Sequence, residues 1–197
     1  MALASCILAV QNCDQASVVA AMKDRFPDHD AFVSPRVDGW VTVHDAKFTP
    51  FEPLGDLCEV AFTISMATRC LCVGLLGFRY FLGLGAFDPQ IERAFVRLLI
   101  ADKISDEPVE MEWLHSNWSV NEPSFKVAGM RLEKVFGERS ILSVARYLEV
   151  CALLGIPHGH FSYRNVLQPS KYLAEHDIQR LDEFVHLTDP DPRARRR

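Results

Sequence analysis

The sequence predicts an α+β fold, a mostly antiparallel sheet with helices packed on one side of it. The patterns follow the order strand, helix, two strands, helix, several strands and two helices, which favours pairing between neighbouring strands. The 197 residues are 49% hydrophobic and 24% charged, the composition of an ordinary globular protein. Without a repeat or an interdomain linker, we expect a single domain over residues 1–188 and a disordered basic tail over residues 189–197.

The first strand and the first helix are expected near the start of the chain. Residues 3–10 form a continuous apolar run, which indicates a central strand covered on both faces. Asp14 has the side chain of a helix N-cap, and Val18, Met22 and Phe26 follow at spacings of four. This spacing predicts a helix with one apolar face.

Two strands and a second helix are expected next. An extended segment begins at Ala31, the pair Asp38-Gly39 makes a turn, and residues 40–44 are rich in β-branched and aromatic side chains. Pro53 suits the first turn of a helix that runs to about Met66.

A group of strands follows. Residues 69–76 and 78–87 are apolar on both faces and are expected to pair around a turn at Gly77. Residues 91–100 suit either a helix or a further strand, and we favour a strand. Residues 109–114 alternate strictly and predict a strand with one face in water.

Two helices are expected in the last third of the chain. Residues 130–136 begin a helix that stops at Gly137, and residues 140–154 form a second helix that ends at Gly155. The expected apolar face of this second helix consists of Ile141, Val144, Ala145, Leu148, Cys151 and Ala152.

The charge and hydropathy of the chain limit its partners. A formal net charge of −5 argues against nucleic acid, whose binding needs clustered Lys and Arg. Residues 60–76 are interrupted by Arg69 and too polar to span a bilayer, and the first residues lack the charged start of an export signal. We therefore expect a cytoplasmic protein with its six cysteines reduced.

The cysteines offer two candidate sites, a metal site and a thiol nucleophile. Cys70 and Cys72, together with His158 and His160, are a possible zinc site, although their spacing is not that of usual structural zinc sites. Cys13 stands ahead of the first helix, a position that can activate a thiol, but no flanking motif supports it. Core packing explains these cysteines as well.

Other catalytic or cofactor motifs are missing from the sequence. Glu110 and Glu112 share one strand face and could act as paired carboxylates, but a solvated face explains them equally. The sequence has no phosphate-binding loop, nucleophile elbow or zinc-protease motif. We therefore expect no catalytic residues and no cofactor.

A mixture of aromatic and polar residues predicts an interaction surface. Such mixtures supply the strongest contacts of protein interfaces. The residues that we expect to bind a partner are Glu110, Glu112, Trp113, His115, Trp118 and Glu122.

Three segments of the chain resemble an uncharacterised family of small bacterial cytosolic proteins. They are residues 38–45, residues 69–81, and residues 148–156 leading into Tyr163. The resemblance implies an α+β fold and no activity.

These observations favour a non-enzymatic binding protein that inhibits a partner, as immunity proteins against bacterial toxins do. An acidic chain is steered toward a basic partner. Two alternatives stay open: a small enzyme or zinc protein that uses the Cys and His residues, and a structural subunit that forms homo-oligomers.

Overall fold

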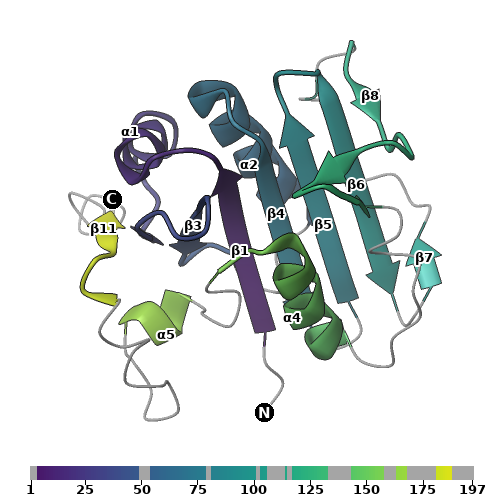
Figure 1. The fold of residues 1–197 in the computed structure, drawn as a ribbon. Helices are drawn as coiled ribbons and strands as arrows, with labels where there is room; N and C mark the ends of the chain where they lie inside the picture. The colour runs from purple at the N-terminus through teal and green to yellow at the C-terminus, as the bar shows by residue number, and fades with distance from the viewer. Residues whose placement is uncertain are drawn as a thin grey trace, which may run out of the picture.

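A computed structural model describes residues 4–48, 54–78, 81–100, 103–105, 114, 117–132, 143–157, 163–167 and 181–187. Within these ranges nine strands form one sheet, and a separate hairpin and four helices complete the fold (Figure 1). The sheet contains β1 (Ala4–Gln11), β2 (Ala31–Val33), β3 (Trp40–Asp45), β4 (Cys72–Phe78), β5 (Phe81–Asp88), β6 (Arg93–Ile100), β7 (Lys103–Ser105), β8 (Ser119–Val120) and β11 (Val185–Leu187). The hairpin is β9 (Lys126–Val127) with β10 (Met130–Arg131), and the helices are α1 (Gln15–Arg25), α2 (Leu54–Thr68), α4 (Ser143–Leu154) and α5 (Tyr163–Leu167).

The sheet is mostly antiparallel, which confirms the predicted α+β class. Its order is β11-β2-β3-β1-β4-β5-β6-β7, and β8 runs parallel to the first residues of β6. The segment from β1 to β4 has the order β2-β3-β1-β4 with α1 and α2 as its two crossover helices, which is the split β-α-β, or ferredoxin-like, arrangement. The meander of β4, β5 and β6 extends this sheet on one side, and β11 extends it on the other.

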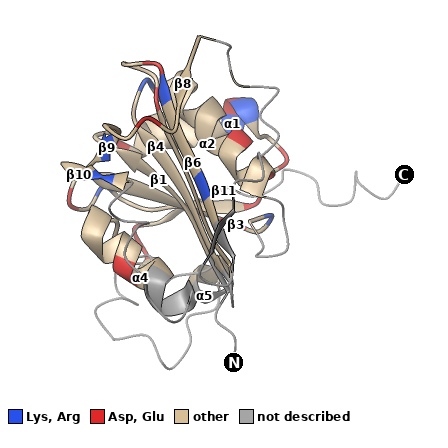
Figure 2. Cartoon of the chain, turned by 90° about the vertical axis from the view of Figure 1, so that its right-hand side faces the viewer, with Lys and Arg blue, Asp and Glu red and all other residues tan. Residues whose placement is uncertain are grey.

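The helices cover both faces of the sheet, so the expectation that they pack on one side was wrong. Leu8 and Val10 of β1 belong to a core cluster with α1 and α2, whereas Ile7 and Ala9 belong to a second cluster with α4. Figure 2 shows α4 on one side of the sheet and α1 and α2 on the other. The continuous apolar run of β1 already indicated two covered faces, because successive side chains of a strand point in opposite directions.

The first helix begins where the sequence predicts. Asp14 caps α1 by accepting a hydrogen bond from the backbone N–H of Ser17 at 2.8 Å. Val18 and Met22 are fully buried against α2 and the sheet, as their spacing predicts. Strands β2, β3 and β6 and helix α2 also form where they are expected.

The turn expected at Gly77 lies further along the chain, because Gly77 is inside β4 and pairs with Leu82 of β5. A Cβ atom on Gly77 would lie 2.7 Å from the Cβ of Tyr147, so the glycine allows α4 to approach the sheet.

Helix α4 is present and ends at Gly155, which has a φ of 65°, but its buried face differs from the expected one. Tyr147, Val150, Cys151 and Leu154 are buried, whereas Leu148 is 40% exposed and Ala152 is also exposed. The helix is apolar on most sides, so its periodicity alone could not decide which face would pack.

Two further expectations concern residues 109–136. Met130 and Arg131, expected to begin a helix, are instead strand β10, which pairs with β9 across a turn with positive φ at Ala128 and Gly129. The expected strand at residues 109–114 lies outside the described residues except for Leu114. None of the described helices is both long and apolar enough to cross a membrane.

Candidate functional site

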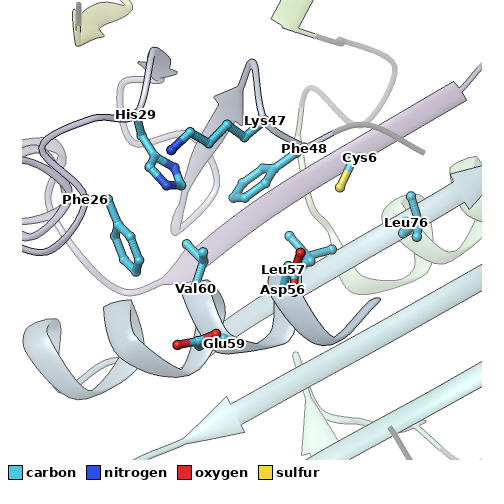
Figure 3. A pocket seen from close by; sticks show the side chains of 10 residues that line it. All are labelled: Cys6, Phe26, His29, Lys47, Phe48, Asp56, Leu57, Glu59, Val60 and Leu76. Atoms are coloured by element: carbon cyan, nitrogen blue, oxygen red, sulfur yellow. The ribbon is translucent and has the colours of Figure 1, made fainter. Parts of the chain in front are cut away.

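A pocket of about 260 Å³ opens between α2 and the loops that follow α1 and β3 (Figure 3). Its apolar wall comes from Cys6, Phe26, Phe48, Leu57, Val60 and Leu76, and its polar groups come from His29, Lys47, Asp56 and Glu59. A concave apolar site with a few convergent polar groups is typical of small-molecule pockets, although this one is slightly smaller than most.

His29 is held in this pocket by a buried carboxylate. Its Nδ1 lies 2.5 Å from Oδ2 of Asp45, whose side chain is 0% exposed. The backbone N–H of Lys47 donates to the other oxygen of Asp45 at 2.8 Å, so both carboxylate oxygens are occupied. Asp45 therefore orients the imidazole ring, as a carboxylate does in catalytic His-Asp pairs.

The pocket lacks an activated thiol beside this imidazole. Burial and the neighbouring Asp45 raise the pKa of Cys6 far above its ordinary value, which keeps the thiol protonated. Cys6 and His29 lie toward opposite ends of the pocket in Figure 3. The pocket is therefore a concave site of the kind that binds small molecules, and Cys6 is not an activated thiol within it.

A second His-Asp contact joins β11, the last described strand, to Asp30, which stands directly before β2. Asp30 accepts a hydrogen bond from the Tyr163 hydroxyl at 2.7 Å, and its other oxygen lies 2.7 Å from Nε2 of His186. The His186 ring stacks on Phe32 with the ring centroids 4.1 Å apart. These contacts attach α5 and β11 to the sheet, so their role is structural.

Cys13 lies near the pair Cys70 and Cys72 at one end of the sheet. Cys13 and Cys72 are buried, Cys70 is partly exposed, and all three pack in the same core cluster. Burial and then the neighbouring Cys70 thiol raise the pKa of Cys13 to about 12. A fast catalytic nucleophile needs the opposite shift, so the structure does not favour Cys13 in that role.

The expected zinc ligands are only partly described. Cys70 and Cys72 are close together, but His158 and His160 lie outside the described residues. Among the residues that the structure describes, no group of three or more His, Cys, Asp or Glu could hold a metal ion.

Of the six residues expected to bind a partner, Trp118 and Glu122 are described. Trp118 is only 7% exposed and packs edge-on against Phe62 of α2 at 5.1 Å, so its ring belongs to the core. Glu122 is half-buried and pairs with Arg93 at 3.2 Å. Glu110, Glu112, Trp113 and His115 lie outside the described residues.

The buried Trp118 is followed directly by β8, a strand whose residues are exposed to solvent. The next residue, Ser119, donates its backbone N–H to Glu92 O at 3.0 Å, and Val96 donates its backbone N–H to the Asn121 side chain at 2.8 Å. These bonds hold β8 against β6, and Val120 of β8 is 38% exposed.

Two other exposed apolar residues lie in segments that are linked to β8 or to its anchor Trp118. Ile91, in the turn before β6, is 52% exposed, and Met66 of α2 is 41% exposed. Met66 stands one helical turn after Phe62, the residue of α2 that contacts Trp118. The turn that contains Ile91 is linked to the end of α2 by a hydrogen bond of 3.4 Å from the Gln90 side chain to Arg69 O. We call Met66, Ile91 and Val120 the corner patch.

Comparison of the chain with protein-family models, with curated proteins and with solved structures found no match.

Proposed function

We propose that this chain is a non-enzymatic protein-binding protein that inhibits a partner, and that it binds this partner through the corner patch. The observation that carries the proposal is the exposure of Met66, Ile91 and Val120, three large apolar side chains that come from three separate segments. Single exposed apolar residues are common on soluble proteins, but grouped ones are typical of interaction sites.

The segment that carries Val120 is held rigidly before any partner arrives. Trp118 anchors it to Phe62, and Phe125, which is 1% exposed, anchors its other end against Phe95. A surface that is already ordered loses little conformational entropy on binding, which favours affinity.

Polar groups surround the patch, as they do at the rim of known interfaces. Asn117 donates to Glu92 at 2.9 Å, and Glu122 pairs with Arg93, so these charged groups already have partners. Acidic and basic residues are mixed around β8, β9 and β10 in Figure 2. The apolar patch therefore supplies the contact, and the rim supplies its orientation.

The partner that suits this chain is a basic protein. The net charge of −5 attracts a positively charged partner and raises the rate of association at low salt. An inhibitor of a basic enzyme, such as an immunity protein against a nuclease toxin, has this combination of charge and compact fold.

Affinity capture from the native host, followed by a binding titration with the recovered partner, tests the proposal. We expect Ile91→Arg with Val120→Arg to weaken binding at least about tenfold, because the added charges meet an apolar contact and a basic partner. The control is Leu167→Arg, which adds one such charge at a 48% exposed residue of α5, on the opposite side of the view in Figure 1.

The wild type and Leu167→Arg should bind equally, and their affinity should fall as salt is added. Equal binding by the double variant, or a loss in Leu167→Arg of the same size, would contradict the corner patch as the binding site. Failure to recover any specific partner would contradict the protein-binding function itself.

A further inference from the structure

The thiols of Cys13 and Cys70 lie at the same end of the sheet because of how β1 pairs with β4. Val10 is paired with Cys72, and the backbone N–H of Gln11 donates to Leu71 O at 2.9 Å. Continuing this antiparallel register by one residue places Asn12 beside Cys70, and the Cys70 Sγ lies 4.0 Å from Asn12 O. Cys13 follows Asn12 directly, and its thiol is within hydrogen-bonding reach of the Cys70 thiol.

The two cysteines differ in their access to solvent. Cys70 is partly exposed, whereas Cys13 is 5% exposed and packs in the core. Each follows a turn residue with a positive φ, Asn12 at 55° and Arg69 at 55°. Both cysteines thus lie in connecting segments at the strand ends and outside the paired strands.

Cys72 is less suited to a reaction with either neighbour. It is 0% exposed and sits inside β4, paired with Val10 on one side and with Phe87 on the other. A disulfide that involved Cys72 would require a shift of a central strand, because disulfide geometry tolerates little change in the distance between the two backbones.

We propose that Cys13 and Cys70 form a reversible disulfide when the chain meets a peroxide. The exposed Cys70 thiol attacks hydrogen peroxide and becomes a sulfenic acid, with release of one water. The Cys13 sulfur then attacks the Cys70 sulfur, the S–O bond breaks, and a second water leaves. The two thiols together lose two electrons and two protons, and the peroxide is reduced to two waters. An external dithiol reverses the bond by exchange.

The burial of Cys13 limits the rate of the second step. Because the pKa of Cys13 is raised to about 12, only a small fraction of this thiol is ionised near neutral pH, and the thiolate is the attacking species. Since the ionised fraction grows as the pH approaches this pKa, the closing step should accelerate with rising pH. The pair is therefore suited to sustained oxidation and not to a fast catalytic cycle.

The disulfide would join two turns that are far apart in the sequence. Cys13 stands directly before Asp14, the cap of α1, and Cys70 follows the end of α2. A cross-link between these turns closes a long loop of the unfolded chain, which stabilises the folded state. We expect the thermal midpoint to rise by roughly 10 °C on oxidation and to return on reduction.

Peptide mapping of the oxidised full chain by mass spectrometry tests the proposal. Trypsin leaves Cys6 and Cys13 in one peptide, residues 1–23, and Cys70 and Cys72 in another, residues 70–79. We expect hydrogen peroxide to produce these two peptides linked, with a mass two hydrogens lower than their sum. Fragmentation of the linked species should assign the bond to Cys13 and Cys70.

Variants of the four cysteines provide the matched controls. Cys13→Ser and Cys70→Ser should abolish the linked species, while Cys6→Ser and Cys72→Ser should retain it. Survival of the link in Cys13→Ser or Cys70→Ser would overturn the proposal, as would a wild-type chain that only gains oxygen atoms. The mapping of the wild-type chain decides the question even if a variant does not fold.

Discussion

At the scale of single residues, Gly77 shows how the absence of a side chain lets a helix approach the sheet. Tyr147 is fully buried, and its Cβ and Cγ occupy the space that a side chain at position 77 would need. The Cβ of Tyr147 is fixed by the backbone of α4, so it cannot rotate away. The contact between α4 and β4 therefore depends on a residue without a side chain at position 77.

Gly77→Ala should destabilise the fold by about 1–3 kcal/mol, because the added Cβ would lie 2.7 Å from Tyr147 Cβ and push α4 from the sheet. Urea unfolding measures this free energy. The matched control is Gly83→Ala on β5, whose added Cβ would meet the flexible end of Leu54 at 2.8 Å. A loss in Gly83→Ala as large as that in Gly77→Ala would contradict the role of the α4 contact.

The thiols are a second example at this scale. Cys58 and Cys72 are buried and protonated, since burial raises the pKa of each well above its ordinary value. Only Cys70 among the cluster of Cys13, Cys70 and Cys72 is partly exposed. The proposed disulfide depends on this difference in exposure within one small group.

At the scale of elements, α1 illustrates how a single cap fixes the start of a helix. The Asp14 carboxylate accepts hydrogen bonds from the Ser17 hydroxyl at 2.7 Å and from the Ser17 backbone N–H at 2.8 Å. These two bonds lower the pKa of Asp14 below its ordinary value of 3.8. The charged form therefore stabilises the folded state.

Asp14→Ala should lower the thermal midpoint by a few degrees, roughly 2–4 °C, at neutral pH. The folded-state pKa is depressed, so the contribution is complete above the unfolded-state pKa and is lost as the pH falls through the lower folded-state value. The difference between wild type and variant should therefore vanish in acid. Asp24→Ala, at the opposite end of α1, is the control and should not lower the midpoint. A difference that stays constant down to pH 2 would contradict the cap.

The corner patch also depends on the arrangement of elements. Its three residues come from α2, from β8 and from the turn that precedes β6. The outer side of β6 is covered by β8 at one end, by β7 at the other, and by the Asn121 side chain between them. The described part of this edge is therefore protected against pairing with another strand. We expect the partner to be recognised by side chains and not by strand addition.

At the scale of the whole molecule, the last described segments, α5 and β11, are hydrogen-bonded to a residue in the first third of the chain. Tyr163 and Asp30 are 133 residues apart in sequence, and His186 and Asp30 are 156 apart, yet both pairs are hydrogen-bonded. Burial and the hydrogen bond to Asp30 raise the pKa of the Tyr163 hydroxyl, so it remains a donor at neutral pH. Asp30 thus joins β2, α5 and β11.

Tyr163→Phe should reduce the free energy of unfolding by about 1 kcal/mol, because it removes one hydrogen bond to a carboxylate and little else. Hydrogen exchange at Val185–Leu187 should become faster in this variant, since β11 depends on the same anchor. Hydrogen exchange in β1, at the centre of the sheet, serves as the internal control. The amides of β1 should remain more slowly exchanging than those of β11 in both proteins. Unchanged exchange in β11 would contradict the coupling.

The sequence by itself determined most elements and the fold class, because those depend on local patterns. The apolar run of β1, the Asp14 cap, the strands β2, β3 and β6, and the end of α4 at Gly155 all follow from neighbouring residues. Only the tertiary structure decided which helices cover which face of the sheet, the buried face of α4 and the position of Trp118 in the core. The pairs His29 with Asp45 and Cys13 with Cys70 also lie far apart in the chain, and no local pattern connects them. They meet because the register of the paired strands and the crossovers of α1 and α2 set the distances between remote segments, and those contacts form only when the whole sheet is assembled.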